Sequence, residues 1–164
     1  MEPREEFRHI MQIRFFARGK SMPLTICGNS MSPLLKSGDQ IAVKPQKVYQ
    51  VGDIVVFFYD QVLLVHRIVQ MQNGSIVCKG DNSFRLENIS IEDMIGKAVA
   101  QNGKCLPEFP ATLLEQSLAI GQLYQTGHMK IAAIREQPLY AEYQMALQAW
   151  NGCGGRECRN GTDL

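Results

Sequence analysis

Short apolar runs separated by turn-forming residue pairs fill the middle of this chain, and this alternation constrains the fold more than any other feature. Apolar runs meet at Asp60-Gln61 and again at Asn73-Gly74. Asn-Gly is a strong hairpin signal because both residues accept a positive φ. The pattern predicts a mainly β fold with an antiparallel β-domain over residues 21–103. Its expected strands are Leu24–Cys27, Gln40–Val43, Asp53–Tyr59, Val62–Met71, Ser75–Cys78 and Ile95–Ala100.

The segments on either side of this β-domain have helical patterns. Residues 1–20 carry apolar side chains at helical spacing among charges, which predicts an amphipathic N-terminal helix. Residues 111–124 and 138–150 are rich in helix formers, so residues 104–150 are expected to form a small helical appendage. We expect its apolar side chains to dock on the β-domain, with binding of a partner as the alternative. Residues 151–164 are expected to be a disordered tail.

Charge and composition exclude several classes of protein. Seventeen Lys and Arg against sixteen Asp and Glu give a net charge of +1, which removes the electrostatic argument for a nucleic-acid binder. The longest apolar run, Ile54 to Tyr59, is far shorter than the roughly 20 residues of a membrane-spanning helix. The N-terminus also lacks the apolar core of a signal peptide. No membrane span is therefore expected.

Five cysteines, an odd number, are scattered along the chain. Without an export signal they are interpreted as reduced thiols, which predicts a cytoplasmic protein. Cys153 and Cys158 are separated by four residues, and no histidine lies near them. Two thiols alone are a poor metal site, so no metal and no cofactor are expected.

One histidine stands out as a candidate catalytic group. His66 lies inside a predicted strand, where an imidazole is costly unless it is hydrogen-bonded or used in catalysis. A strand alternates its faces, so Arg67 should point away from His66, into a surface or ion-pair role. Lys44 and Lys79 are the other bases to consider, and Lys79, close to Asp81, is expected to be a solvated charge at a strand end. A structural role remains the plain alternative for a lone strand histidine.

Five short motifs follow one another in a fixed order across residues 22–101. They are Gly28-Asn29-Ser30-Met31-Ser32-Pro33, Gly38-Asp39, Gly52-Asp53-Ile54-Val55-Val56-Phe57, His66-Arg67 and Gly80-Asp81-Asn82. The ordered set resembles the superfamily that joins type I signal peptidases to the self-cleaving repressor proteases. This resemblance implies their β-fold and a serine peptidase activity.

The resemblance also implies roles for individual residues. Ser30 corresponds to the nucleophile, and His66 takes the position at which bacterial signal peptidases and the repressors carry a lysine. A histidine there is similar to the endoplasmic-reticulum-type signal peptidases, which use a Ser–His pair. Asp81 corresponds to the third member, which would orient the imidazole. Glu87 is the alternative orienting acid, and the choice between the two stays open.

The position two residues before the nucleophile departs from many signal peptidases. Gly28 stands there in place of a serine that donates to the oxyanion, as in the repressor branch. The oxyanion hole would then depend on the backbone N–H groups of Asn29 and Ser30.

The resemblance implies a soluble serine endopeptidase that cleaves a peptide or precursor protein, such as a leader peptide, in the cytoplasm. A charged helix is expected where the family's membrane anchor would stand. The alternative is a catalytically silent module that binds an extended peptide at a sheet edge. A self-cleaving regulator is disfavoured, because about 20 residues before the β-domain are too few for a helix-turn-helix. The substrate, its cleavage site and the oligomeric state stay open.

Overall fold

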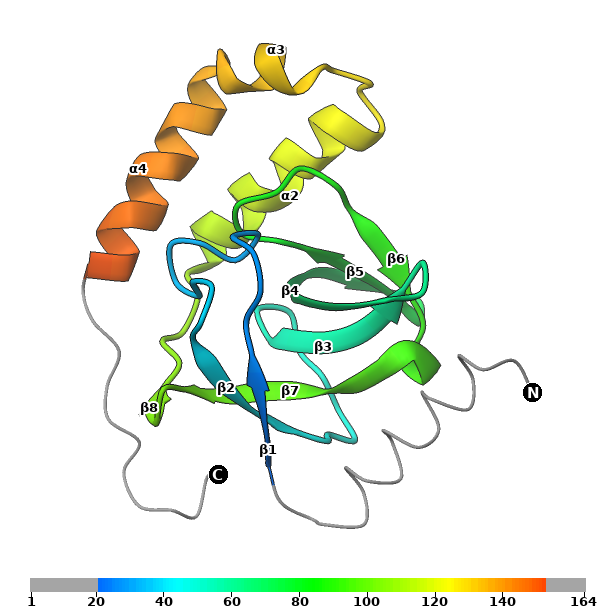
Figure 1. Cartoon of the computed structure of the whole chain (residues 1–164). Helices are drawn as coiled ribbons and strands as arrows, with labels where there is room; N and C mark the ends of the chain where they lie inside the picture. Colours follow the sequence, from blue (N-terminus) through cyan, green and yellow to red (C-terminus); the bar gives the residue numbers. More distant parts are fainter. Residues whose placement is uncertain (1–20, 153–164) are drawn as a thin grey trace.

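A curled antiparallel sheet forms the body of the molecule, and three helices lie along one side of it (Figure 1). The computed structural model describes residues 21–152; the predicted N-terminal helix over 1–20 and most of the predicted tail lie outside them. The strands are β1 (Met22–Thr25), β2 (Gln40–Lys44), β3 (Ile54–Tyr59), β4 (Val62–Gln72), β5 (Ser75–Lys79), β6 (Glu87–Ile89), β7 (Met94–Gln101) and β8 (Lys104–Cys105). Their order is β1-β2-β7-β3-β4-β5-β6, with β8 paired to β7. The mainly β prediction is confirmed.

Two tight turns set the register of the central hairpins. Asp60 and Gln61 have φ values of 44° and 71° between β3 and β4, and Asn73 and Gly74 have 48° and 78° between β4 and β5. Positive φ at both central residues matches the twist of the flanking strands. Both predicted hairpins are therefore present. A third turn of this kind, at Asn102-Gly103, joins β7 to β8 and was not predicted, nor were the short strands β6 and β8.

Strand β3 is buried on both of its faces, which explains its unbroken apolar sequence. Ile54 and Val56 pack in one apolar cluster with Met31 and Leu35. Val55 and Phe57 point the other way, into a second cluster that includes Ile68 of β4. A strand that is covered on both sides reads as a continuous apolar run instead of an alternating one.

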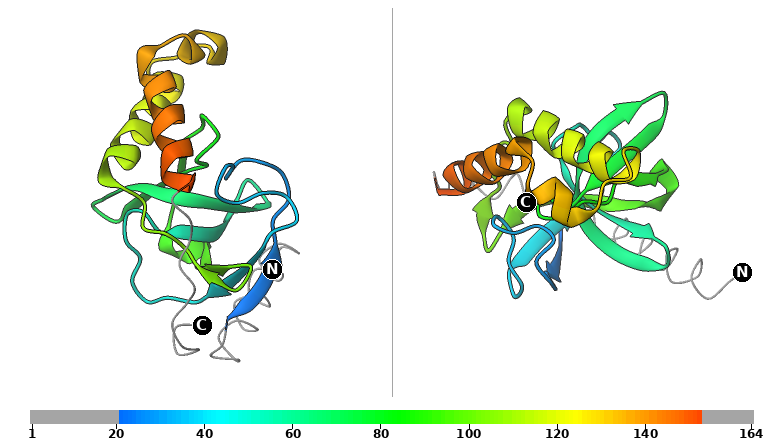
Figure 2. Two further views of the ribbon diagram at one scale, coloured as in Figure 1. Left: turned by 90° about the vertical axis from the view of Figure 1, so that its left-hand side faces the viewer. Right: turned by 90° about the horizontal axis from the view of Figure 1, so that it is seen from above.

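The α-helices of the described residues are α2 (Ala111–Gln125), α3 (Ile131–Arg135) and α4 (Pro138–Gly152), and we call α2–α4 the helical appendage. A short 3-10 helix, η1 (Ile91–Asp93), lies between β6 and β7. Helices α2–α4 share an apolar cluster of their own and project from one end of the sheet (Figure 2). Leu114 and Leu118 of α2 pack against Val69, Val77 and Leu86 of the β-domain. The predicted docking is therefore present. The five-residue α3 was not predicted, and α4 continues to Gly152, into the segment predicted as tail.

Two further expectations can be compared with residues 21–152. No helix in this range is both long enough and apolar enough to cross a membrane. Cys27 and Cys78 are free thiols. Cys105 is disulfide-bonded, so the prediction that every cysteine is reduced is wrong at that residue.

Candidate active site

Ser30 and His66 meet at hydrogen-bonding distance although 36 positions separate them in the chain. Ser30 lies in the loop between β1 and β2, and His66 lies in the middle of β4. The Oγ atom of Ser30 is 3.1 Å from Nε2 of His66. His66 is only 5% exposed, so its imidazole is largely shielded from solvent and has the Ser30 hydroxyl as a polar neighbour.

The Ser30 loop is held in place by a segment that follows β5. The backbone N–H of Asn82 donates to the carbonyl oxygen of Ser30 at 2.8 Å, and the side-chain amide of Asn82 donates to the carbonyl of Asn29 at 3.1 Å. Met31, 2% exposed, points its sulfur toward the backbone N–H of Asp81 at 3.4 Å. The motif that contains Ser30 and the Gly-Asp-Asn motif are thus joined by direct contacts.

Glu87 is the acid beside the histidine. It comes from β6, is 1% exposed, and places Oε1 2.8 Å from Nδ1 of His66. The oxygen lies off the direction of an N–H bond at Nδ1, so the contact is a close charge–dipole or ion pair without ideal hydrogen-bond geometry. The Nη2 atom of Arg85 lies 3.5 Å from the same oxygen. The structure therefore brings Ser30, His66 and Glu87 together.

The Asp81 carboxylate is directed away from His66, to Arg67. Arg67 donates from Nε to Oδ1 at 2.9 Å and from Nη2 to Oδ2 at 2.8 Å, and its Nη1 donates to the carbonyl of Gly52 at 2.9 Å. Both side chains are almost fully buried, and the guanidinium stacks 3.7 Å from the ring centroid of Phe109. Because side chains alternate along β4, Arg67 points to the face opposite His66, and the Asp81 carboxylate lies on that face as the counter-charge of Arg67. Of the two candidate acids, Glu87 contacts the imidazole and Asp81 does not.

Lys79 is buried, which corrects the expectation of a solvated charge. Its Nζ donates to the carbonyl of Gly80 and to Oγ of Ser117, each at 3.0 Å. Burial lowers the pKa of Lys79 from 10.5 to about 8, while the charges of Asp81 and Glu87 act in the opposite direction. The partner Ser117 lies on α2, 38 positions away. Local sequence therefore held no signal that this lysine would be covered.

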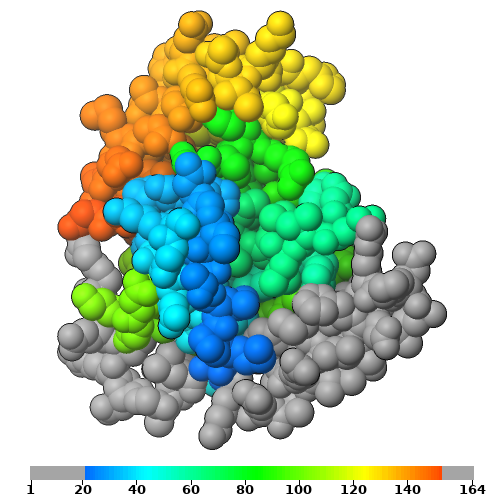
Figure 3. Space-filling view, viewed as in Figure 1, coloured from blue at the N-terminus to red at the C-terminus, as the bar shows by residue number. Residues whose placement is uncertain are grey.

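Ser30 opens onto a small apolar cavity of about 260 Å³. One wall comes from Leu24 to Cys27, and the opposite wall comes from Leu63 to Val65 of β4. Figure 3 shows β1 and the loop that follows it, in blue, beside the β3–β4 hairpin on the face viewed. Among the described residues, strand β1 pairs with β2 alone, so its other edge can exchange backbone hydrogen bonds with an extended chain.

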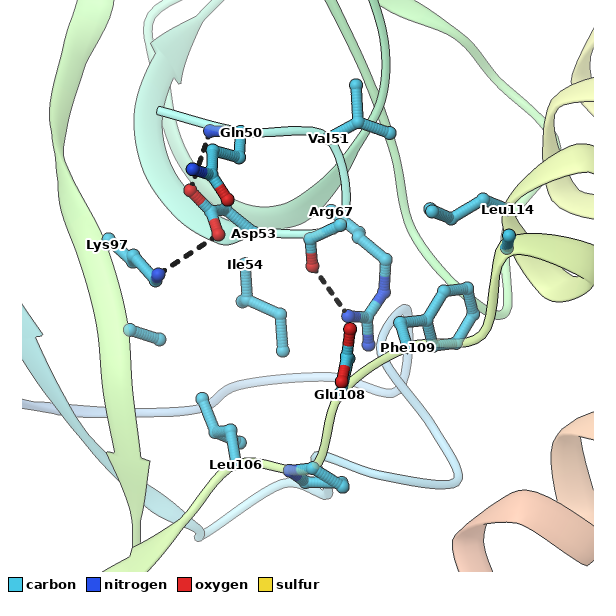
Figure 4. A pocket seen from close by; sticks show the side chains of 14 residues that line it. Gln50, Val51, Asp53, Ile54, Arg67, Lys97, Leu106, Glu108, Phe109 and Leu114 are labelled. Atoms are coloured by element: carbon cyan, nitrogen blue, oxygen red, sulfur yellow. Dashed lines mark hydrogen bonds and ion pairs between the residues drawn. The ribbon is translucent and has the colours of Figure 1, made fainter. Parts of the chain in front are cut away.

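A larger cavity, of about 420 Å³, lies on the Arg67 side of the sheet (Figure 4). Its rim carries the ion pair between Lys97 and Asp53, with Nζ and Oδ1 3.0 Å apart. Arg67 lines it together with the loop that leads into α2. Ser30, His66 and Glu87 are not part of its lining, so it is separate from the candidate active site.

Comparison with known proteins identifies the family of the chain. No curated protein matches the chain. The family model described as Peptidase S24-like matches residues 4–101, which is more than half of the chain. The matched range contains Ser30, His66 and Glu87, and it ends before the helical appendage. The chain belongs to the Peptidase S24-like family.

Proposed function

We propose that this protein is a serine endopeptidase in which Ser30 is the nucleophile, His66 the general base and Glu87 the acid that orients the imidazole. The observation that carries the proposal is the 3.1 Å approach of the Ser30 hydroxyl to Nε2 of His66. A serine hydroxyl is a weak nucleophile by itself and needs such a base to remove its proton. Glu87 replaces Asp81 in the third role, because its carboxylate is the one in contact with Nδ1.

The steps follow from the positions of these atoms. Ser30 Oγ attacks the substrate carbonyl carbon as its proton passes to Nε2 of His66. The carboxylate of Glu87 stabilises the imidazolium that forms. The C–N bond then breaks, the amine leaves with the proton from Nε2, and an acyl-enzyme remains. Water, activated by the same imidazole, releases the acid and restores Ser30.

The backbone around the nucleophile offers donors for the developing oxyanion. Within the described part of the chain, no group accepts a hydrogen bond from the backbone N–H of Asn29 or of Ser30. Free N–H groups beside the attacking oxygen can stabilise negative charge that develops on a carbonyl oxygen. This supports the oxyanion role inferred for Asn29 and Ser30 from the family pattern.

The proposed substrate is an extended peptide segment with an apolar side chain near the scissile bond. The edge of β1 that is unpaired within residues 21–152 can hold its backbone, and the cavity beside Ser30 is lined mainly by apolar side chains. A precursor protein or leader peptide with a flexible cleavage site would present such a segment. We also propose that the protein acts in the cytoplasm and that its substrate is such a precursor.

A fluorophosphonate probe tests the mechanism without a known substrate. Wild-type protein should be labelled covalently, and Ser30→Ala and His66→Ala should lose the label while remaining folded by circular dichroism. Ser37→Ala, an exposed serine in the same loop, is the matched control and should label like wild type. Labelling that survives Ser30→Ala would refute the mechanism.

The alternative is a peptide-binding module on the same fold, which the free edge of β1 favours. It predicts folded wild-type protein that resists the probe yet binds extended apolar peptides. The two functions therefore give opposite results in one labelling experiment. The close Ser30–His66 contact favours the peptidase, because a binding module has no use for an activated hydroxyl.

A further inference from the structure

The helical appendage contacts the candidate active site through one short segment of backbone. We call residues 79–82 the Lys79–Asn82 segment; it follows β5 and carries the Gly-Asp-Asn motif. The segment lies between the Ser30 loop on one side and helices α2 and α4 on the other. The appendage lies outside the residues that match the family model, so the match assigns it no role.

On the active-site side, the segment touches both members of the proposed catalytic pair. Asn82 donates to the carbonyl of Ser30 at 2.8 Å. At Gly80 the fit is so close that an added Cβ would lie 2.7 Å from the carbonyl oxygen of Ser30 and 3.1 Å from Nε2 of His66. A displacement of this backbone by a few tenths of an ångström would therefore be felt by the nucleophile and by the base.

On the appendage side, two buried hydroxyl groups hold the same segment. Tyr143 of α4, 1% exposed, donates from its hydroxyl to the carbonyl of Asp81 at 2.7 Å. Ser117 of α2, fully buried, accepts from Nζ of Lys79 at 3.0 Å, and the same Nζ donates to the carbonyl of Gly80. Consecutive carbonyls are thus fixed by groups that depend on α2 and α4.

Hydrogen bonds of this kind fix position, whereas apolar contacts are non-directional. Leu114 and Leu118 already attach α2 to the sheet by apolar packing. The buried polar contacts add a defined placement of the Lys79–Asn82 segment. A buried polar group also costs free energy when its partner is removed, so the segment should shift when either hydroxyl is lost.

We propose that the helical appendage is a positioning element for the nucleophile: Ser117 and Tyr143 hold the Lys79–Asn82 segment, and the segment holds Ser30 in line with His66. The inference rests on the peptidase function proposed above. Ser117 and Tyr143 touch no reacting atom, so they are positioning residues and not catalytic ones.

Tyr143→Phe and Ser117→Ala in the full-length chain test this proposal, since each removes one hydroxyl and leaves the side-chain packing largely intact. Tyr140→Phe is the matched control: it removes a hydroxyl from the same helix and keeps the ring that stacks on Phe84. The rate of fluorophosphonate labelling at saturating probe and the probe concentration for half-maximal rate are measured for each variant. Hydrogen exchange of the backbone amide of Asn82 reports its contact with Ser30 independently of any reaction with the probe.

We expect the saturating labelling rate to fall about fivefold in Tyr143→Phe and in Ser117→Ala, the factor that corresponds to one hydrogen bond of ordinary strength. The half-saturating probe concentration should stay within about twofold of wild type, and the Asn82 amide should exchange about fivefold faster. Tyr140→Phe should match wild type in all three. The Ile68 amide, which donates to Asp53, is the internal reference and should not change.

Two results would overturn the positioning role. One is a lower melting temperature with wild-type labelling and wild-type Asn82 exchange, which would mean that the hydroxyls only attach the appendage. The other is faster exchange with an unchanged labelling rate. Should wild-type protein resist the probe, the peptidase function fails by itself. The Asn82 exchange then decides alone whether the appendage holds the Ser30 loop.

Discussion

Replacing each candidate acid by its amide separates the two roles that the structure gives them. Glu87→Gln keeps the size of the side chain and removes the charge beside His66. Asp81→Asn does the same beside Arg67. We expect Glu87→Gln to lower the rate of cleavage and Asp81→Asn to lower the stability of the fold.

The magnitudes follow from the contacts. Unit charges 2.8 Å apart, the distance from Nδ1 to Oε1, interact by about 6 kcal/mol at an effective dielectric constant of about 20. This is an upper limit for the stabilisation that Glu87 gives to the imidazolium. Since about 1.4 kcal/mol corresponds to a factor of ten, Glu87→Gln should lower kcat by roughly 10²- to 10⁴-fold.

Asp81→Asn leaves the guanidinium of Arg67, which is 1% exposed, without its counter-charge. Removal of one partner of a buried ion pair costs about 3–5 kcal/mol. In a chain of this size that lowers Tm by roughly 10 °C. At temperatures well below Tm, its kcat should stay within about tenfold of wild type.

The assay combines single-turnover cleavage, or fluorophosphonate labelling, with thermal unfolding of wild type and both variants. Each variant is compared at a temperature at which circular dichroism shows it to be folded. A larger loss of activity in folded Asp81→Asn than in Glu87→Gln would refute the two roles assigned to these acids.

Three other substitutions test neighbouring contacts. Gly80→Ala should act mainly on the labelling rate and less on Tm, because its Cβ would collide with the carbonyl oxygen of Ser30. Equal labelling rates of variant and wild type would contradict this. Between pH 8 and 10.5 the unfolded chain binds a proton at Lys79 that the folded chain does not, so rising pH favours the folded state. The difference in the free energy of urea unfolding between wild type and Lys79→Met should therefore shift by roughly 3 kcal/mol in favour of wild type across that range. A difference that does not change with pH would contradict this expectation. Arg67→Lys should cost about 2–3 kcal/mol in the same urea assay, because an ammonium cannot make the bidentate contact with Asp81; a loss below about 1 kcal/mol would show that the fork geometry matters little.

The hairpins were predictable because their signal is local. Asp60-Gln61 and Asn73-Gly74 take up the positive φ values that tight turns need, and the apolar runs beside them fix which strands pair. The alternation of side chains along a strand also predicts that His66 and Arg67 lie on opposite faces of β4. Strand β6 was not predicted, because its three residues, Glu-Asn-Ile, are too few to show an alternating pattern.

The choice between Asp81 and Glu87 needed the structure. Both acids lie downstream of His66 at plausible distances along the chain, and spacing alone does not say which carboxylate turns toward the imidazole. One clue was present in the sequence: Arg67 had to lie on the face away from His66, and it needed a counter-charge there. The burial of Lys79 had no such clue, since the side chain that covers it comes from α2.

Strand β4 has a consequence for how sequence change can act on this protein. Consecutive side chains face opposite ways, so a one-residue slip in the register of β4 would turn the imidazole of His66 and the guanidinium of Arg67 to the opposite faces of the sheet. The imidazole would then leave the face on which Ser30 lies, and the guanidinium would leave the face on which it contacts Asp81. Point substitutions can therefore change the imidazole and the guanidinium one at a time, whereas a slip in the register of this strand would move both together.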